Sequence, residues 1–251
     1  MIEMKTPRNP LTGWLASSLP LCIGLAVLNS CAAADSPKPA DGAANKPATA
    51  TGGLVPLEIK LPAPAFKGTP KDIQLSSYVE PLSDKPRPPM IVPAGLKNIA
   101  AGKKVTCSDK NATPDVLEKI TDGDKESADQ SIILLRKGTQ YVQMDLGSPH
   151  ELFAIVIWHA HNSPKVYRDV IVQIADDAEF TQKVSILFNN DQDNSSGLGA
   201  GTDREYFETN EGKLINAKGA KARYIRFYSK GSTESAMNEY TELEVYGRPA
   251  Q

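Results

Sequence analysis

The three histidines of the chain are the first residues whose type and spacing could do chemistry, because His150, His159 and His161 fall within twelve residues. His159 and His161 stand two apart, so on a continuing strand both would point to the same face. Two such imidazoles suit a transition metal when a third ligand completes the site. No third ligand stands nearby in the sequence, so the metal hypothesis lacks part of its donor set.

An acidic loop at residues 122–127 offers the oxygen ligands that a harder cation needs. Asp122 and Asp124 flank Gly123, which lets the chain turn tightly, and Ser127 adds further oxygen atoms. Calcium takes about six to eight oxygens, often from carboxylates and carbonyls of an irregular loop. The alternative interpretation is a solvated acidic loop that caps a turn. A second acidic loop, residues 191–203, matches the calcium-loop pattern poorly and favours a polar surface loop.

No pattern in the chain is sufficient for catalysis. Neither Gly-x-Ser-x-Gly nor His-Glu-x-x-His occurs, so we expect no enzyme. The many carboxylates leave room for a catalytic pair in a cleft, although chance supplies such pairs freely. Lys and Arg total 28 against 30 Asp and Glu, a net charge of -2. Nucleic-acid binders need a more basic surface than this balance provides.

Short apolar runs separated by turn residues are the elements that must position these groups. Strand-like runs occupy residues 105–107, 141–146, 152–158, 170–174, 184–188, 224–228 and 243–246. They are rich in β-branched and aromatic residues, and 152–158 is apolar throughout, as in a strand buried on both faces. One short helix is predicted from Thr113 to near Ile120, because Pro114 suits a first helical turn. Many strands with almost no helix predict an all-β jelly-roll sandwich.

Six short motifs follow one another across residues 96–248. They are Asn98–Ser108 (NIAAGKKVTCS), Ile120–Asp124 (ITDGD), Tyr141–Gly147 (YVQMDLG), Val172–Asp177 (VQIADD), Ala222–Arg226 (ARYIR) and Glu242–Gly247 (ELEVYG). In this order they resemble the discoidin domain, also called the F5/8 type C family, which is a galactose-binding-like jelly roll. Many sugar-binding members continue the Asp-Gly loop with Thr and then Trp. This chain has Ser127 and Asp129 there, so that ring is missing.

The resemblance implies a structural calcium ion. Family members supply a closing carboxylate at the place that Glu242 occupies in this sequence. The expected metal ligands are therefore Asp122, Asp124, Ser127 and Glu242. A calcium ion held by them would pin the loop after the short helix to the last strand, and so join the two ends of the domain.

The resemblance also implies a carbohydrate site on the end loops, where sugar-binding members use aromatic rings, His, Arg and Asn. The physical chemistry agrees, because a ring covers the C–H face of a sugar and planar donors bridge its hydroxyls. The candidate ligand-binding residues are Trp158, His159, His161, Tyr167 and Arg168, with Asn194, Asn238 and Tyr240 from other loops. For Trp158 a place in the core is an equal alternative.

The first thirty residues are typical of a lipoprotein signal peptide. Lys5 and Arg8 precede an uncharged stretch whose apolar block is too short to span a bilayer comfortably. The sequence Leu28-Asn29-Ser30-Cys31 resembles a bacterial lipobox, in which cleavage leaves Cys31 to receive lipid. The alternative is an ordinary secretory signal that is cut near residues 32–34.

Two segments separate this signal, residues 1–30, from the discoidin-like domain at 96–249. Residues 31–53 are poor in large apolar side chains and predict a disordered tether. Residues 54–95 are rich in Pro, with an alternating apolar pattern near Val55 and Leu57, and predict an extended arm. This arm either packs along its own domain or binds a protein partner, and both alternatives stay open.

These observations together predict a non-catalytic lipoprotein outside the cytoplasm, held on the outer membrane or cell surface by its lipid anchor. Its discoidin-like domain would bind carbohydrate or another cell-envelope polymer, with calcium as a structural ion and no nucleic acid as partner. The alternative, from a different class, is a structural or assembly lipoprotein whose Pro-rich arm engages a protein partner.

Overall fold

The computed structural model describes residues 53–67, 76–83 and 85–251, all of which belong to the unit Ala50–Gln251. The predicted signal peptide at 1–30, the lipidation site Cys31 and all but the last residue of the tether at 31–53 lie outside the described residues. Within the described ranges, no helix has the length and apolar character that crossing a membrane requires.

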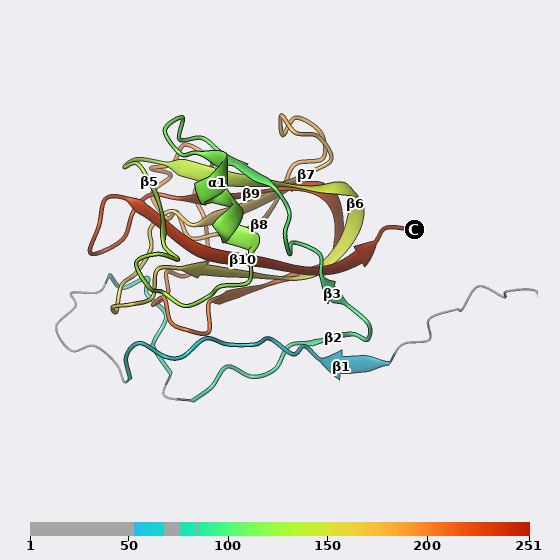
Figure 1. The fold of residues 1–251 in the computed structure, drawn as a ribbon, viewed down its shortest axis with the longest axis horizontal. Helices are drawn as coiled ribbons and strands as arrows, with labels where there is room; N and C mark the ends of the chain where they lie inside the picture. The colour runs from blue at the N-terminus through green and yellow to red at the C-terminus, as the bar shows by residue number, and fades with distance from the viewer. Residues whose placement is uncertain (1–52, 68–75, 84) are drawn as a thin grey trace, which may run out of the picture. The chain divides into compact units, whose positions relative to one another are not determined.

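Strands make up most of the regular structure (Figure 1). The elements in chain order are β1 (Leu54–Pro56), β2 (Ile91–Pro93), β3 (Lys97–Asn98), β4 (Val105–Cys107), α1 (Pro114–Leu117), the 3-10 turn Glu118–Thr121, β5 (Ile133–Leu135), β6 (Gln140–His159), β7 (Ile171–Ala175), β8 (Ser185–Asn189), β9 (Lys213–Ser229) and β10 (Asn238–Pro249). The short helix that follows Thr113 is confirmed, with Pro114 in its first turn.

Two long strands, β6 and β9, connect the layers of the fold, and Figure 1 shows β6 curving from one layer into the other. The first part of β6, 140–145, pairs with β4 and with the end of β9, which continues through β7 to β8. The second part, 150–159, pairs with β10 and with the start of β9, and β10 carries β3 and β5 on its other edge. We name these layers sheet I and sheet II.

The bend in β6 has a local cause. Its register with β9 breaks between Asp145 and His150. Gly147 lies in this gap with φ +88, a left-handed conformation that a residue without a Cβ adopts easily. The pairings among these strands are all antiparallel, and two sheets that share bent strands form a sandwich. The predicted all-β jelly-roll class is therefore confirmed.

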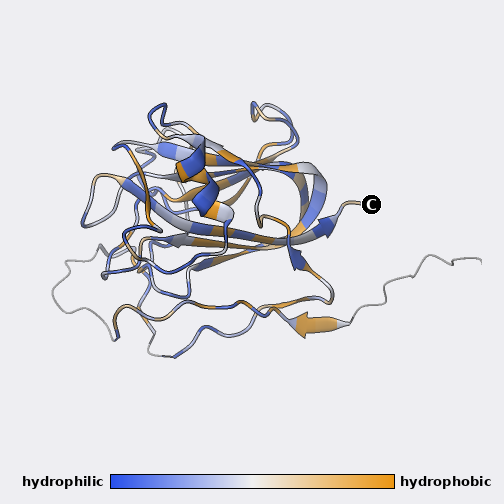
Figure 2. Cartoon of the chain, viewed as in Figure 1, coloured by the Kyte–Doolittle hydropathy of each residue, from blue (hydrophilic) through white to orange (hydrophobic). Residues whose placement is uncertain are grey.

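The main core fills the space between the two sheets. It contains Val142 and Ile155 of β6, Val172 of β7, Ile225 of β9 and Leu243 of β10, all fully buried. Along β10 the core residues alternate with polar ones, and Figure 2 shows such changes between orange and blue, whereas Ile155 lies in a continuous apolar run of β6. This alternation is what a sheet with one face in the core requires, and it fixes which side chains reach the interior.

The outer face of sheet II is also apolar, and the Pro-rich segment covers it. The cluster on this face consists of Ala154, Val156, Trp158 and Tyr246, packed against Leu57, Ile59, Met90, Leu96 and Leu214. The segment runs out along the sheet and returns, with β1 and β2 paired antiparallel. The indole Nε1 of Trp158 donates to the Asn210 carbonyl (3.0 Å), and the Lys125 ammonium lies 4.8 Å from the ring centre.

Polar contacts hold the Pro-rich segment at further points along its length. The Arg87 guanidinium donates to the carbonyls of Gly212 (2.7 Å) and Glu211 (3.0 Å). Lys125 Nζ donates to the Lys60 carbonyl (2.8 Å). Of the two placements that the sequence leaves open for residues 54–95, the described part of the segment has contacts with its own domain, whereas a protein partner stays untested.

Met90 and Ile91 are neighbours that provide a matched test of this packing. Met90 lies against the Trp158 cluster, whereas Ile91 is 55% exposed. We expect Met90→Ala to lower the free energy of unfolding by about 1–2 kcal/mol, because a half-buried side chain leaves a gap. Ile91→Ala should stay within about 0.5 kcal/mol of the wild type. Urea unfolding followed by tryptophan fluorescence measures the stability of both variants. Equal losses of stability would contradict the packing of Met90 against the Trp158 cluster.

Candidate functional site

Three connections form one end of the sandwich. They are residues 160–170 between β6 and β7, residues 190–212 between β8 and β9, and residues 230–237 between β9 and β10. These connections are rich in Asn, Asp, Ser and Gly. They contain four of the eight residues that the sequence predicts for ligand binding, namely His161, Tyr167, Arg168 and Asn194.

Most of the predicted ligand-binding residues are buried beneath these loops. At most 1% of the surface is exposed for Trp158, His159, His161, Tyr167, Asn238 and Tyr240. They are therefore not presented to a ligand, and this part of the predicted sugar surface must be corrected. Arg168 and Asn194 alone of the predicted set are exposed.

The two neighbouring histidines have separate structural roles. His159 ends β6 with Nδ1 3.0 Å from Glu208 Oε2, and its ring stacks on Tyr167 at a centroid distance of 4.3 Å. His161 Nε2 donates to the Lys125 carbonyl (2.9 Å). Among the described residues, the one group of three or more His, Cys, Asp or Glu side chains whose ligand atoms converge consists of three aspartates, so neither histidine belongs to such a group.

Asn238 shows why these buried polar groups are structural. Its Nδ2 donates to the carbonyls of Arg136 (2.7 Å) and Gly138 (3.0 Å). Its Oδ1 accepts hydrogen bonds from Ser229 Oγ (2.8 Å) and the Gly231 amide (2.9 Å). The side-chain amide thus joins the start of β10 to two other loops and has no hydrogen-bonding capacity left for a sugar.

Arg168 lies between two hollows in the surface of this end, which together we name the end-loop site. The first hollow, about 720 Å³, is lined by Lys137, Gly138, Arg168, Lys230 and residues 232–236. The second, about 490 Å³, is lined by Arg168, Asp169, Asn190, Gln192, Asp193, Ser195, Glu205 and Lys230, with Ser76 and Tyr78 from the Pro-rich segment. Arg168 and Lys230 line both hollows.

The end-loop site offers free hydrogen-bond donors and an exposed aromatic ring. Within the described ranges, the Arg168 guanidinium makes neither a hydrogen bond nor an ion pair. Asn190 Oδ1 accepts from the Val170 amide (2.7 Å), but Nδ2 has no partner although the residue is 2% exposed. The ring of Tyr78 is on the rim and is 54% exposed. This combination can pair with hydroxyl groups and cover an apolar face.

Three carboxylates, those of Asp169, Asp191 and Asp193, converge beside this site, with one oxygen of each within 4.8 Å of the others. Burial, followed by the Asp191 charge, raises the pKa of Asp169, although a hydrogen bond from Ser195 Oγ (2.6 Å) opposes this. The Lys230 ammonium lies 3.6 Å from Asp169 Oδ2 and balances part of the charge. The cluster thus supplies hydrogen-bond acceptors at one edge of the second hollow.

The predicted calcium ligands lie at a different place, where the turn after α1 meets β10. The Gly123 amide donates to Glu242 Oε2 (3.1 Å), so the sequence-distant groups are in contact. Asp124 Oδ2 accepts a hydrogen bond from Ser131 Oγ (2.6 Å), and Ser127 Oγ accepts one from the His161 amide (2.8 Å). The structure thus brings the turn and Glu242 together, with Asp124 and Ser127 engaged in protein hydrogen bonds.

The buried groups at this turn have unused oxygen atoms. Glu242 is fully buried, and its Oε1 has no hydrogen-bond partner among the described residues; the same holds for Thr241 Oγ1 beside it. Burial, followed by the nearby charges of Asp122 and Glu244, raises the pKa of Glu242 to about 9. A buried carboxylate beside other acids is costly without a counter-charge. The Lys125 ammonium, 2.6 Å from Glu244 Oε1, supplies part of that charge, and the free Oε1 of Glu242 leaves one ligand position for a cation.

Comparisons with known proteins find no relative by sequence, since no family model and no curated protein matches. Among solved structures, a family 89 glycoside hydrolase from Clostridium perfringens aligns over 61% of this chain and 15% of its own, with 19% identity and a TM-score of 0.44. Chitosan-binding module 1 of a chitosanase/glucanase from Paenibacillus sp. IK-5 aligns over 60% and 99%, with 17% identity and a TM-score of 0.39.

A third structure, the CBM32 of AlyQ in complex with 4,5-unsaturated mannuronic acid, aligns over 56% of this chain and 92% of its own, with 22% identity and a TM-score of 0.39. The neighbours thus include carbohydrate-binding modules of discoidin-like fold. This chain spans 15% of the glycoside hydrolase chain. With identities below 25% and TM-scores below 0.5, these likenesses assign neither an activity nor a ligand to the chain.

Proposed function

We propose that this chain is a non-catalytic, lipid-anchored protein that binds carbohydrate through the end-loop site. The observation that carries the proposal is the free guanidinium of Arg168 between two hollows whose walls hold further donors and acceptors. A sugar presents hydroxyls that both donate and accept, together with apolar C–H faces. Arg168, the Asn190 amide and the exposed ring of Tyr78 match these needs from three separate segments.

The buried layer below the site supports the proposal by making the site rigid. His159, Tyr167 and Asn238 are fixed by hydrogen bonds and stacking, so the loops above them are held in place. A preorganised site loses less conformational entropy on binding than a flexible one does. Their role is therefore to support the loops that hold the ligand.

Arg168→Ala tests the site. We expect about a tenfold or larger loss of affinity for the glycan that wild type binds best on a glycan array, because charge-assisted hydrogen bonds are lost. Arg248→Ala is the matched control, since Arg248 pairs with Glu151 near the other end of β10. Titration calorimetry measures both variants. Unchanged affinity in Arg168→Ala would place the glycan elsewhere, and a similar loss in Arg248→Ala would show that the effect is not local.

Calcium at the Asp122 turn is a second part of the proposal. Glu242 supplies the buried carboxylate, and its unpaired Oε1 supports a cation at this position. Asp122 and Asp124 are exposed beside it and carry the additional negative charge that a calcium site requires. The ion would add to the positive charge that Lys125 already supplies near the buried Glu242, and its role would be structural.

Calcium should therefore stabilise the protein. At a calcium concentration about one hundredfold above Kd, we expect a rise in Tm of about 5 °C or more, because a ligand of the folded state adds stability. Glu242→Gln should abolish the rise, whereas Glu118→Gln, at an exposed residue of the 3-10 turn, should retain it. Differential scanning calorimetry with chelator and with calcium gives the comparison. The same rise in Glu242→Gln would contradict a site at Glu242.

The lipid anchor rests on the sequence pattern that ends at Cys31. We expect mass spectrometry of the membrane-extracted protein to find an N-terminal, diacylated Cys31. Cys31→Ala should move the protein from the membrane fraction to the soluble fraction or leave it unprocessed, because a buried acyl chain contributes about 0.8 kcal/mol per CH₂. Cys22→Ala, inside the apolar block, is the control and should remain anchored. An unmodified Cys31 in the wild type would refute the anchor.

A further inference from the structure

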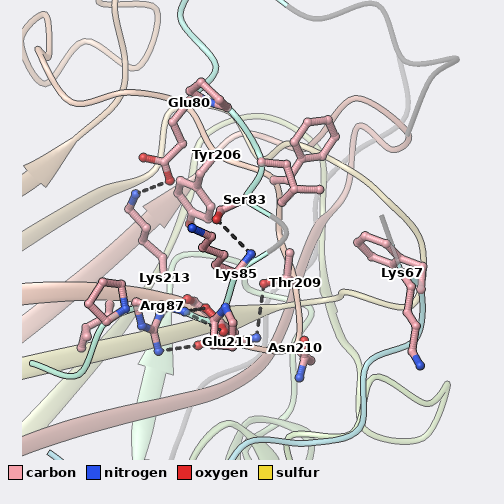
Figure 3. A pocket seen from close by; sticks show the side chains of 18 of the residues that line it. Lys67, Glu80, Ser83, Lys85, Arg87, Tyr206, Thr209, Asn210, Glu211 and Lys213 are labelled. Carbon is pink, nitrogen blue, oxygen red and sulfur yellow. Dashed lines mark hydrogen bonds and ion pairs between the residues drawn. The ribbon is translucent and has the colours of Figure 1, made fainter. Parts of the chain in front are cut away.

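A second and separate groove lies between the Pro-rich segment and the sandwich, and we name it the arm groove (Figure 3). Residues 65–67 and 80–88 of the segment form one wall, apart from position 84, and residues 206–214 form the other. Its volume is about 680 Å³, which is within the usual range of roughly 300–1,000 Å³ for small-molecule sites. Arg87 holds the two walls together through the carbonyls of Glu211 and Gly212.

Tyr206, in the wall of this groove, has a buried hydroxyl. Tyr206 is 3% exposed, and its ring packs in the main core. Its hydroxyl has no hydrogen-bond partner among the described residues. Burial, with the nearby charge of Glu208, raises the pKa of Tyr206, so the hydroxyl stays protonated and remains a donor. Phenylalanine would pack equally well, so the unpaired hydroxyl indicates a bound acceptor.

A fixed ion pair stands beside the Tyr206 ring, as Figure 3 shows. Lys213 Nζ lies 2.9 Å from Glu80 Oε1 and 4.5 Å from the centre of the Tyr206 ring. The Lys213 side chain is 17% exposed, so the ammonium has little freedom to move. An ammonium donor next to a carboxylate acceptor matches two neighbouring hydroxyls of a sugar, one of which accepts while the other donates. Phe66 lines the same groove and offers an apolar ring.

We propose that the arm groove is a second saccharide site, in which the Tyr206 hydroxyl, Lys213 and Glu80 bind a neutral sugar unit. The class of ligand rests on the proposed function of the end-loop site, whereas the place rests on the geometry of the groove itself. Glu205 lines the end-loop site and Tyr206 the arm groove. Tyr78 of the Pro-rich segment likewise lines the end-loop site, and Glu80 lines the arm groove.

Tyr206→Phe is the test, because it removes one hydroxyl and keeps the ring. Cellotetraose, chitotetraose and mannotetraose at millimolar concentration serve as probes, and hydrogen exchange read by mass spectrometry locates the bound probe. We expect at least one probe to slow exchange in residues 206–214 of the wild type. Tyr206→Phe should weaken this protection by about five- to tenfold in apparent Kd, the effect of one lost hydrogen bond.

Stability provides the second readout. Since the Tyr206 hydroxyl has no partner in the described parts of the chain, its removal should leave Tm unchanged or raise it. Tyr141→Phe is the matched control, because Tyr141 lines neither site, and it should retain wild-type protection. Absence of protection in residues 206–214 with every probe overturns the proposal. So does protection that is unchanged in Tyr206→Phe, or a loss of binding that is accompanied by a fall in Tm.

The same experiment shows which of the two proposed sites is wrong if one of them is. Arg168→Ala should remove protection of residues 160–170 and 230–236 and leave residues 206–214 protected. If only the arm-groove proposal is wrong, protection is confined to the end-loop segments and depends on Arg168. If the end-loop site is wrong, those segments stay unprotected in the wild type, whatever happens in residues 206–214.

Discussion

The second half of β6 must be covered on both of its faces, and the rest of the structure depends on this constraint. Residues 154–159 are all buried, although the strand lies in a sheet with only one face toward the main core. Ile155 and Ile157 point into that core, while Val156 and Trp158 point to the other side. Leaving the Trp158 side chain exposed to water would lower the stability of the fold by about 2 kcal/mol or more. The Pro-rich segment provides the missing cover, which gives it a defined path over sheet II.

The sequence predicts the strands well because their signal is local. The continuous apolar run at 152–158 correctly indicates a strand buried on both faces, and the Tyr141–Gly147 motif correctly places a strand before the bend in β6. What covers the second face carries no such signal. Trp158 packs against Leu57, Ile59 and Met90. In that segment Pro interrupts the apolar pattern, and the contact is formed across about 70 to 100 positions of sequence.

The ligand site is harder to predict because burial decides it. By residue type alone, His159, Tyr167 and Arg168 are equally suitable for binding a sugar. A buried aromatic network contains the same kinds of residue as a sugar site, so composition does not separate the two. His159 is buried because Glu208, far away in the sequence, supplies a partner for its ring nitrogen. Asn190 and Lys230 line the end-loop site but follow strands without any distinctive spacing. Tyr78 belongs to a segment whose sequence gives no reason to place it beside Arg168.

The Pro-rich segment therefore connects stability to binding through one set of contacts. Its anchors on the Trp158 face fix its path, and that path brings Tyr78 to the end-loop site and Glu80 to Lys213. Any ligand that touches both the segment and the sandwich binds only the docked arrangement, so by mass action it must also stabilise that arrangement. The converse holds as well, because a substitution that loosens the cover of Trp158 lowers the population of the form that can bind. The sandwich requires the Pro-rich segment to cover the apolar face of sheet II, and the same segment is thereby positioned to bind ligand.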